Sequence, residues 1–409
     1  GTTLQWIKRY MGRYDDVYTV EAALGYDGRN CRGFITYSKS KFRAKLDGTL
    51  LGPNLKLEER DEKAPVTATL QGKLENNMLA LEWVNQGNTV GSHLEMTEIG
   101  PTNTPVDFCG ADKWVNRYVG AWKGKPMELV LVRLHNGDMS AQLWNSVDNN
   151  SENLKGSMTP NGDLTLESYP EPGKPLFWLE SNIRSLQSIR CDWTSSNGEM
   201  RTIEFTLRES LTMGCVEYAD FVSSYDILYP NTSCTGCNQW FSQQITNWTN
   251  RCKSAIQSKK LTPVPANRNA LRASMWPEVS CWSDGIFSGY LNYSDTWSGP
   301  AQGLAFNLDL KTGKPILLED LFQKDFDFKS WVNEYMRKES PKNPRFAADP
   351  KFREWLYAEG YPLFTLRRDG IKISTLFHPI YGQQHLLIPY AELKPFLLPN
   401  TPITEFVPK

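Results

Sequence analysis

The first half of the chain contains an internal repeat, and this repeat restricts the fold more strongly than any other feature. Each copy has the same landmarks in the same order: an aromatic residue, a Leu-x-Gly turn, a Leu-x-Leu segment and a tryptophan. The landmarks are Tyr37, Gly48, Leu55-Lys-Leu57 and Trp83 in the first copy, and Trp144, Gly156, Leu164-Thr-Leu166 and Trp193 in the second. The offset is 108 residues at the glycines and 110 at the last tryptophans. This order predicts a duplication, and coincidence between short β-strands with similar turns is the alternative.

Both copies have the pattern of antiparallel β-structure. Phe42-Arg-Ala-Lys-Leu46 and Leu55-Lys-Leu57 alternate apolar and polar residues, as half-buried strands do. Asp-Gly and Asn-Gly pairs, which accept positive φ and close tight hairpins, recur between such runs. We therefore predict two β-meander, barrel-like modules at 1–100 and 106–210, joined by a linker, Gly100-Pro-Thr-Asn-Thr-Pro105. They resemble small β modules of bacterial envelope lipoproteins.

The second half mixes helices and strands. The β alternation ends near 208–215, and Trp240, Ile245, Trp248, Cys252 and Ile256 then share one face of a helix predicted over 238–259. The further elements expected are a loop at 260–277, adjacent strands at 279–293 and 303–310, helices at 328–338 and 350–357, and strands over 361–393. This order predicts an α+β domain at 215–409.

Four segments of this domain resemble the DUF3298 family, whose domains occur in bacterial cell-surface and periplasmic proteins. They are Asn307-Leu-Asp-Leu-Lys-Thr-Gly313, Leu318-Glu-Asp-Leu-Phe322, Asp369-Gly370-Ile371 and Ile388-Pro-Tyr-Ala-Glu-Leu393. The resemblance covers roughly residues 220–398. It implies a mixed α+β fold and a location outside the cytoplasm, periplasmic or at the cell surface. It supplies no reaction.

Charge and hydropathy exclude some classes of partner. The chain has 45 Lys and Arg against 46 Asp and Glu, whereas nucleic-acid binding needs a basic surface. No run of 18 apolar residues is present, so no membrane span is expected. The 14 tryptophans are expected mainly in cores, with aromatic surface for sugar or protein binding as the alternative. The opening Gly-Thr-Thr-Leu-Gln-Trp is no signal peptide, and whether an export signal or lipid anchor preceded Gly1 stays open.

Eight cysteines suit an oxidising compartment. We expect them to form structural disulfides of open connectivity; they are Cys31, Cys109, Cys191, Cys215, Cys234, Cys237, Cys252 and Cys281. Cys237 and Cys252 would lie about 22 Å apart along one helix, so they are not partners. At least one of Cys234 and Cys237 is instead expected to reach Cys215, Cys252 or Cys281.

Cys234-Thr-Gly-Cys237 allows two sharper interpretations. A Cys-x-x-Cys at a helix start can act in disulfide exchange, but this needs a βαβ context that the pattern does not indicate. Zinc held with Cys252 and Cys281 is the other interpretation, although the second pair is too widely spaced for a usual structural site.

Other candidate site residues have an ordinary structural interpretation as well. His378 and His385 flank a turn and could face one another in a metal site, but surface or structural histidines fit equally. Glu319 and Asp320 could form a hydrolytic carboxylate pair, but acids at a helix start are favoured by the helix dipole. The acids around Glu59 fit a solvated hairpin end. No nucleotide-binding motif is present, and no cofactor is expected.

Together these features favour an exported bacterial envelope protein that binds rather than catalyses. DUF3298-like domains occur beside peptidoglycan deacetylase domains and in anti-sigma factors that sense lysozyme. By resemblance, the expected partner is peptidoglycan or a lysozyme-like protein. The alternative is an enzyme, such as a hydrolase of envelope glycans.

Overall fold

The structure is a computed structural model of the 409-residue chain. It describes residues 5–14, 18–37, 42–60, 66–87, 89–99, 113–134, 137–159, 161–169, 176–219, 223–261, 270–298, 302–339, 342, 363–376 and 383–408.

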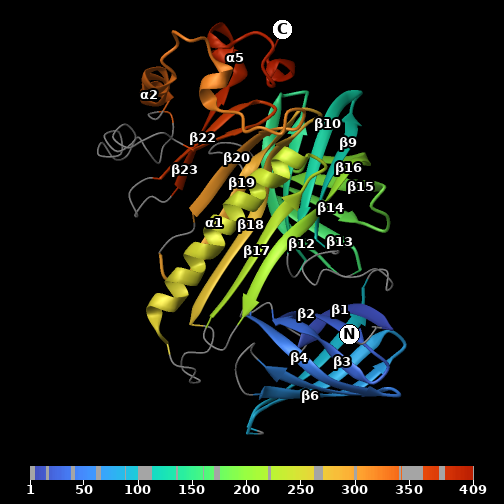
Figure 1. Cartoon of the computed structure of the whole chain (residues 1–409). Coiled ribbons are helices and arrows are strands. Elements are labelled where there is room, and N and C mark those ends of the chain that lie inside the picture. The colour runs from blue at the N-terminus through green and yellow to red at the C-terminus, as the bar shows by residue number, and fades with distance from the viewer. Residues whose placement is uncertain are drawn as a thin grey trace.

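The first eight strands form a closed antiparallel barrel in which each strand pairs with the next in sequence (Figure 1). They are β1 (Trp6–Tyr14), β2 (Tyr18–Tyr26), β3 (Asn30–Tyr37), β4 (Phe42–Leu51), β5 (Asn54–Arg60), β6 (Val66–Glu75), β7 (Met78–Asn85) and β8 (Gly91–Glu98). β8 closes the ring on β1. Inward-facing residues such as Leu57, Leu70 and Leu81 are buried, because alternate side chains of each strand point into the barrel.

The next eight strands form a second ring. They are β9 (Trp114–Trp122), β10 (Lys125–Arg133), β11 (Asp138–Asn145), β12 (Asn150–Met158), β13 (Asp163–Ser168), β14 (Phe177–Asn182), β15 (Ser188–Ser195) and β16 (Met200–Ala219). β16 pairs with β15 through its first residues and with β9 along its middle, and this closes the ring. The order of pairing is again that of a meander.

The strands of the two rings correspond with a shift of eight. Gly48 on β4 is opposite Leu57 on β5, and Gly156 on β12 is opposite Leu166 on β13. A Cβ at Gly48 would lie 1.9 Å from the carbonyl oxygen of Lys56, and one at Gly156 would lie 1.9 Å from that of Thr165. The repeated glycine therefore has one function in both copies, which is close approach of neighbouring strands.

β16 also belongs to a third sheet. Its last residues, from Thr212 to Ala219, pair with β17 (Ser223–Asn231). The sheet continues through β18 (Leu271–Trp282), β19 (Ile286–Asp295) and β20 (Gln302–Asp309). β16 thus runs through 210–215, where the sequence suggested a boundary; the three-domain division stays a prediction.

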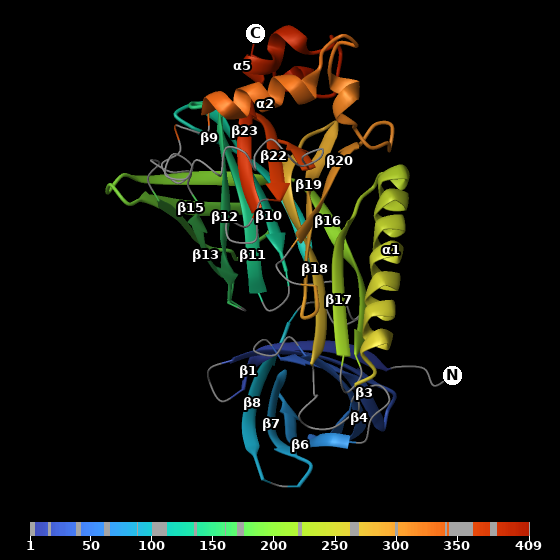
Figure 2. The ribbon, with the colours of Figure 1, turned by 90° about the vertical axis from the view of Figure 1, so that its left-hand side faces the viewer.

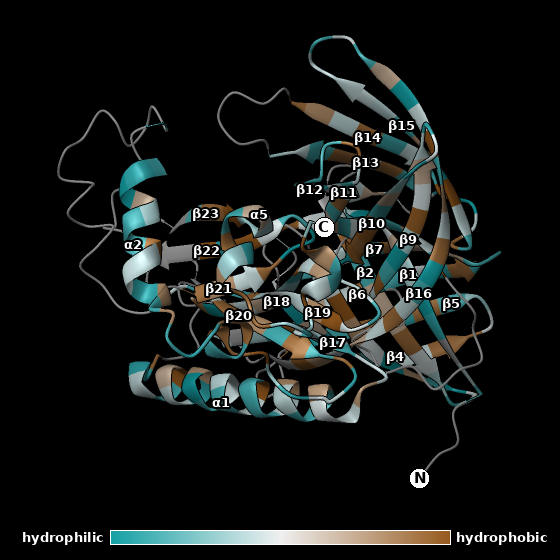
Figure 3. Cartoon of the chain, turned by 90° about the horizontal axis from the view of Figure 1, so that it is seen from above, coloured by the Kyte–Doolittle hydropathy of each residue, from teal (hydrophilic) through white to brown (hydrophobic). Residues whose placement is uncertain are grey.

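The helix α1 (Thr235–Lys259) connects β17 to β18, and these two strands are parallel. α1 covers one face of the sheet, and β10 to β12 lie against the opposite face of the sheet (Figures 2 and 3). Phe241, Ile245 and Trp248 of α1 are buried in the core that the helix shares with the sheet. The helix agrees with the sequence prediction. The βαβ unit contradicts the expectation that this context is missing.

The strand expected over 279–293 is in fact a hairpin of β18 and β19. Ser283 closes its turn by accepting hydrogen bonds from the N–H groups of Gly285 and Ile286, 3.3 and 3.1 Å away. β18 also begins at Leu271, inside the expected loop, because Ala273, Met275 and Val279 pack in the core shared with α1.

The last part of the chain forms a small sheet and short helices at the far end of the molecule (Figure 1). Its elements are η3 (Leu318–Leu321), α2 (Phe328–Glu339), β21 (Leu363–Leu366), β22 (Gly370–Leu376), β23 (Gln383–Pro389), α5 (Tyr390–Leu393), η5 (Lys394–Phe396) and η6 (Thr404–Phe406). α2 and the three strands were predicted, and the helix expected at 350–357 lies outside the described residues. The predicted fold class, tandem all-β modules followed by an α+β part, is confirmed.

Candidate functional site

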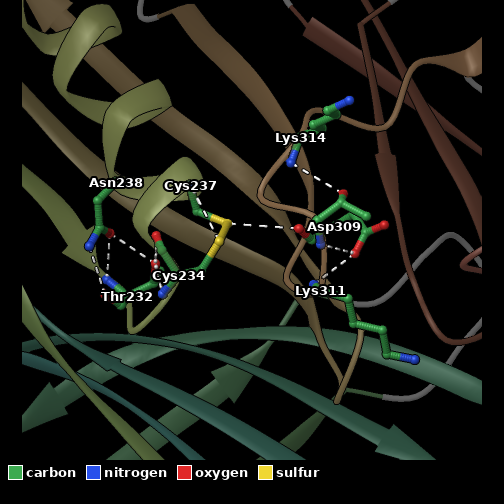
Figure 4. The surroundings of a disulfide bond; sticks show 8 residues. Thr232, Cys234, Cys237, Asn238, Asp309, Lys311 and Lys314 are labelled. Atoms are coloured by element: carbon green, nitrogen blue, oxygen red, sulfur yellow. Dashed lines mark hydrogen bonds between the residues drawn. A yellow bond between two sulfur atoms is a disulfide. The ribbon is translucent and has the colours of Figure 1, made fainter.

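A disulfide joins Cys234 and Cys237 at the start of α1 (Figure 4). Cys234 is the N-cap residue of the helix, with an extended backbone, and the first helical residue is Thr235. Cys234 is partly exposed, whereas Cys237 is fully buried in the core under the helix. The two sulfur atoms therefore differ in their access to solvent.

Hydrogen bonds fix the chain that leads into the helix. The backbone N–H of Thr232 donates to Asn238 Oδ1 across 2.8 Å, and Asn238 Nδ2 donates to the carbonyl oxygen of Thr232 across 2.7 Å. The N–H of Cys237 points at Cys234 Sγ, 3.3 Å away, which satisfies one of the otherwise open donors of the first turn. The position of Cys234 is thus set by its surroundings as well as by the disulfide.

The turn that follows β20 packs against the disulfide. Gly313 in this turn has φ +72°, and its Cα lies 2.9 Å from the place where a Cβ on Gly236 would be. The carbonyl oxygen of Asp309 lies 3.9 Å from Cys237 Sγ (Figure 4). This turn is the Lys-Thr-Gly segment of the family-like motif, so the motif and the Cys-x-x-Cys meet in space.

The cysteine pairing expected from the sequence was wrong in two respects: Cys234 and Cys237 do not reach a distant cysteine, and four of the eight cysteines are free. Cys234 pairs with its neighbour Cys237 and reaches neither Cys252 nor Cys281. Cys215 is disulfide-bonded too, while Cys31, Cys191, Cys252 and Cys281 are free and buried, and burial raises the pKa of each free thiol to about 12. Cys109 lies outside the described residues. The zinc interpretation needed four thiolates and does not fit a pair that is already a disulfide.

The other sequence candidates do not come together with the disulfide. Glu319 and Asp320 are exposed on η3, where the N–H of Leu317 donates to Asp320 Oδ2 across 3.3 Å. His385 lies on β23 near the ring of Tyr290, and desolvation together with the charge of Lys372 lowers its pKa. His378 lies outside the described residues. Within the described part of the chain, no three His, Cys, Asp or Glu residues are grouped as a metal site.

Glu59 is buried rather than solvated. The carboxylate of this β5 residue accepts hydrogen bonds from Thr67 Oγ1 at 2.9 Å and Trp83 Nε1 at 3.1 Å, and from the hydroxyl of Tyr37. These hydrogen bonds offset the free-energy cost of burying a carboxyl group inside a barrel. Two landmarks of the first repeat, Tyr37 and Trp83, therefore donate hydrogen bonds to the same carboxylate.

A cavity of about 280 Å³ lies on the face of the sheet that α1 leaves uncovered. Alternation along β18 places Ala273, Met275 and Val279 in the core shared with α1, and Met275 also contributes to the cavity lining. The residues between them, Ser274, Trp276 and Glu278, line the cavity together with Asp226 and Leu228 of β17. β11 and β12 of the second barrel supply the opposite wall, and Thr36 of the first barrel contributes to the rim. All three parts of the chain thus meet at this cavity.

The lining of the cavity is apolar with several polar groups, as is usual for a ligand pocket. Its acids are Asp138, Asp226 and Glu278, its cation is Lys155, and its hydroxyls include Ser140 and Ser274. Trp276 is partly exposed and offers an aromatic ring. The sequence analysis did not find this site, although the alternation Ser274-Trp276-Glu278 was a signal for a half-exposed strand face.

No protein-family model and no curated protein matches the chain. Among solved structures it is similar to a DUF3298 family member from Bacteroides fragilis, at 15% identity and a TM-score of 0.35, over 48% of this chain and 97% of that one. It is also similar to a DUF3298 family protein from Pseudomonas aeruginosa, at 16% identity and a TM-score of 0.34, over 46% and 95%. A transferrin binding protein B from Haemophilus parasuis matches at 9% identity and a TM-score of 0.19, over 52% and 70%. The resemblance to the DUF3298 family that the C-terminal motifs indicated is thus also found by comparison of structures.

Proposed function

We propose that the chain is an exported binding protein of the bacterial envelope, and that its central cavity holds a short glycan such as a peptidoglycan fragment. The single observation behind this proposal is the cavity between β17, β18 and the second barrel. Its size is near the lower end of small-molecule pockets, which suits one or two sugar rings rather than a folded partner.

The chemistry of the lining supports a ligand rich in hydroxyl groups. Carboxylates such as Asp226 and Glu278 accept hydrogen bonds from hydroxyls, and serine hydroxyls both donate and accept them. Trp276 supplies an amphipathic ring on which the apolar face of a sugar can stack. Lys155 provides a cation for an acidic substituent of the glycan.

Two further observations support export. Cys234, Cys237 and Cys215 are disulfide-bonded, and such bonds persist mainly in oxidising compartments. The C-terminal motifs resemble those of the DUF3298 family, whose domains occur in cell-surface and periplasmic proteins. Among the described residues, no helix is long and apolar enough to cross a membrane.

Titration calorimetry with soluble peptidoglycan disaccharides tests the proposal. We expect saturable binding that weakens about tenfold in Trp276→Ala, through loss of stacking and apolar contact, and that also weakens in Asp226→Asn. Tyr169→Ala and Glu180→Gln are matched controls, because both residues are exposed outside the cavity. Absence of saturable binding, or equal affinity in all variants, contradicts the proposal.

The same samples distinguish the other candidate functions. Capture of a lysozyme-like protein without glycan binding, unaffected by Trp276→Ala, places the ligand on another surface. Release of new reducing ends from peptidoglycan supports the hydrolase alternative. Either outcome contradicts the proposal that the cavity binds a glycan as its function.

A further inference from the structure

The disulfide of α1 has the placement of a reactive disulfide rather than of a simple cross-link. A structural bridge usually joins distant segments, whereas Cys234 and Cys237 lie three residues apart in one helical turn. Closing so short a loop removes little chain entropy from the unfolded state. The bond lies at the N-terminus of a 25-residue helix, in a βαβ unit built from β17, α1 and β18.

When the disulfide is reduced, the N-terminus of α1 favours the thiolate form of Cys234. The N–H of Cys237 already points at Cys234 Sγ, 3.3 Å away, so the donor is in place before any reaction. No acidic residue occupies the first turn of α1, so nothing there opposes the positive end of the helix dipole. Thiolates at helix N-termini are favoured by these same interactions.

In the reduced protein, the surroundings of Cys237 favour its neutral thiol form. It is fully buried, and burial disfavours a charged sulfur. The carbonyl oxygen of Asp309 lies 3.9 Å from its sulfur and can accept a hydrogen bond from an S–H group but not from a thiolate. The two cysteines therefore differ both in access and in the protonation state that their surroundings favour.

We propose that Cys234–Cys237 is a redox site that exchanges with dithiols and accepts two electrons from them. A thiolate of the partner attacks Cys234 Sγ, the accessible sulfur, and forms a mixed disulfide while the Cys234–Cys237 bond breaks. The electron pair of that bond goes to Cys237 Sγ, which takes a proton from water. The second thiolate of the partner then attacks its own mixed-disulfide sulfur, so the partner is oxidised and Cys234 leaves as a thiolate.

The direction of transfer follows from the stabilised leaving group. A disulfide whose reduced form is stabilised is a stronger oxidant. The N-terminus of α1 stabilises reduced Cys234, so the exchange favours oxidation of the partner. The partner approaches past Thr235 and Cys234, since both are accessible and Cys237 is not.

A single-turnover experiment tests this site in the full chain. Oxidised protein is mixed without oxygen with a reduced synthetic peptide that carries two cysteines, and both products are measured by mass spectrometry. We expect about one peptide disulfide per chain, with Cys234 and Cys237 reduced and the disulfide of Cys215 intact. A pair that stays oxidised in excess dithiol peptide, or that is reduced no faster than the disulfide of Cys215, overturns the proposal.

Two variants identify the attacked sulfur. Cys237→Ser, first linked to the peptide through an activated peptide disulfide, is expected to hold the mixed disulfide at Cys234. Cys234→Ser, treated in the same way, is expected to form none at Cys237 while folded. Equal capture at the two positions contradicts the assignment. Circular dichroism of both variants shows whether they keep the wild-type fold, and the wild-type exchange assay remains decisive if either does not.

Discussion

Arg117 of β9 donates a hydrogen bond to Asp284 in the turn between β18 and β19, across 2.8 Å, although 167 residues separate them. The guanidinium is almost fully buried, and it also donates to Glu209 of β16 at 2.8 Å and to Glu128 of β10 at 3.2 Å. Glu128 in turn pairs with Arg368 beyond β21. One arginine therefore connects the second barrel to the hairpin of the neighbouring sheet.

Loss of this arginine is expected to cost far more than loss of its exposed partner. Arg117→Met removes a buried guanidinium that pairs with three carboxylates, of which Glu128 is itself mostly buried, and we expect the free energy of unfolding to fall by about 3 kcal/mol. Asp284→Asn removes the ion pair with Arg117, but the Asp284 carboxylate is mostly exposed. The free energy of unfolding is therefore expected to fall by less than about 1 kcal/mol. Denaturant unfolding of both variants measures the difference, and equal losses would contradict the view that burial sets the cost.

The repeated glycines provide a test of the duplication. Gly48→Ala and Gly156→Ala would place a Cβ 1.9 Å from a neighbouring carbonyl oxygen, so each is expected to destabilise its barrel by about 3 kcal/mol. Gly91→Ala is the matched control, since the nearest atom to its Cβ would be 3.5 Å away. Thermal unfolding gives the comparison. A mild effect at one of the two repeated positions would show that the copies differ there.

The charge of the first turn of α1 is expected to control the reactivity of Cys234. Thr235→Asp places a carboxylate beside the thiolate, so alkylation of reduced Cys234 should shift to higher pH by about half a unit. Thr235→Asn keeps the size without the charge and should leave the profile unchanged. The rate of iodoacetamide labelling against pH measures both. Identical pH profiles in the two variants would show that the helix N-terminus does not control the reactivity of Cys234.

The buried free thiols are expected to destabilise the protein in alkaline solution. Burial raises the pKa of Cys31, Cys191, Cys252 and Cys281 to about 12, above the value of about 8.5 for an exposed cysteine. The folded state therefore holds these protons more tightly, so their contribution is complete below pH about 8.5 and falls as the pH rises toward 12.

Urea unfolding between pH 8 and 11 follows this loss, and peptide mapping of labelled thiols checks its origin. At pH 8 the four thiols should resist alkylation in the folded protein and react after unfolding. Rapid labelling of any of them in the folded state would show that its burial is incomplete.

The sequence predicted what depends on local patterns. Alternation and Asn-Gly turns specify hairpins, so the order of strands in both barrels followed, and the spacing of Ile245 and Trp248 specified α1. It did not predict that β18 begins at Leu271, because Pro and Asn before it resemble a loop and only packing under α1 makes it a strand. Glu59 was misjudged for a related reason, since its donors Thr67 and Trp83 come from other strands.

The candidate sites depended even more on tertiary structure. Cys-x-x-Cys was visible, but the pairing of β17 with β18 that surrounds it joins residues on either side of a helix and leaves no local signal. The cavity takes residues from Thr36 to Glu278, so no spacing in the sequence could indicate it.

The double membership of β16 has a consequence for the order of assembly. Its residues from Phe205 to Thr212 complete the second barrel against β9, and those from Thr212 to Ala219 provide the edge on which β17 forms. During synthesis the barrel stays open until this last strand emerges, and the same strand then serves as the template for the next sheet. The barrel and the sheet should therefore mature in sequence and unfold as one cooperative unit, while the first barrel, complete by Glu98, can fold ahead of both.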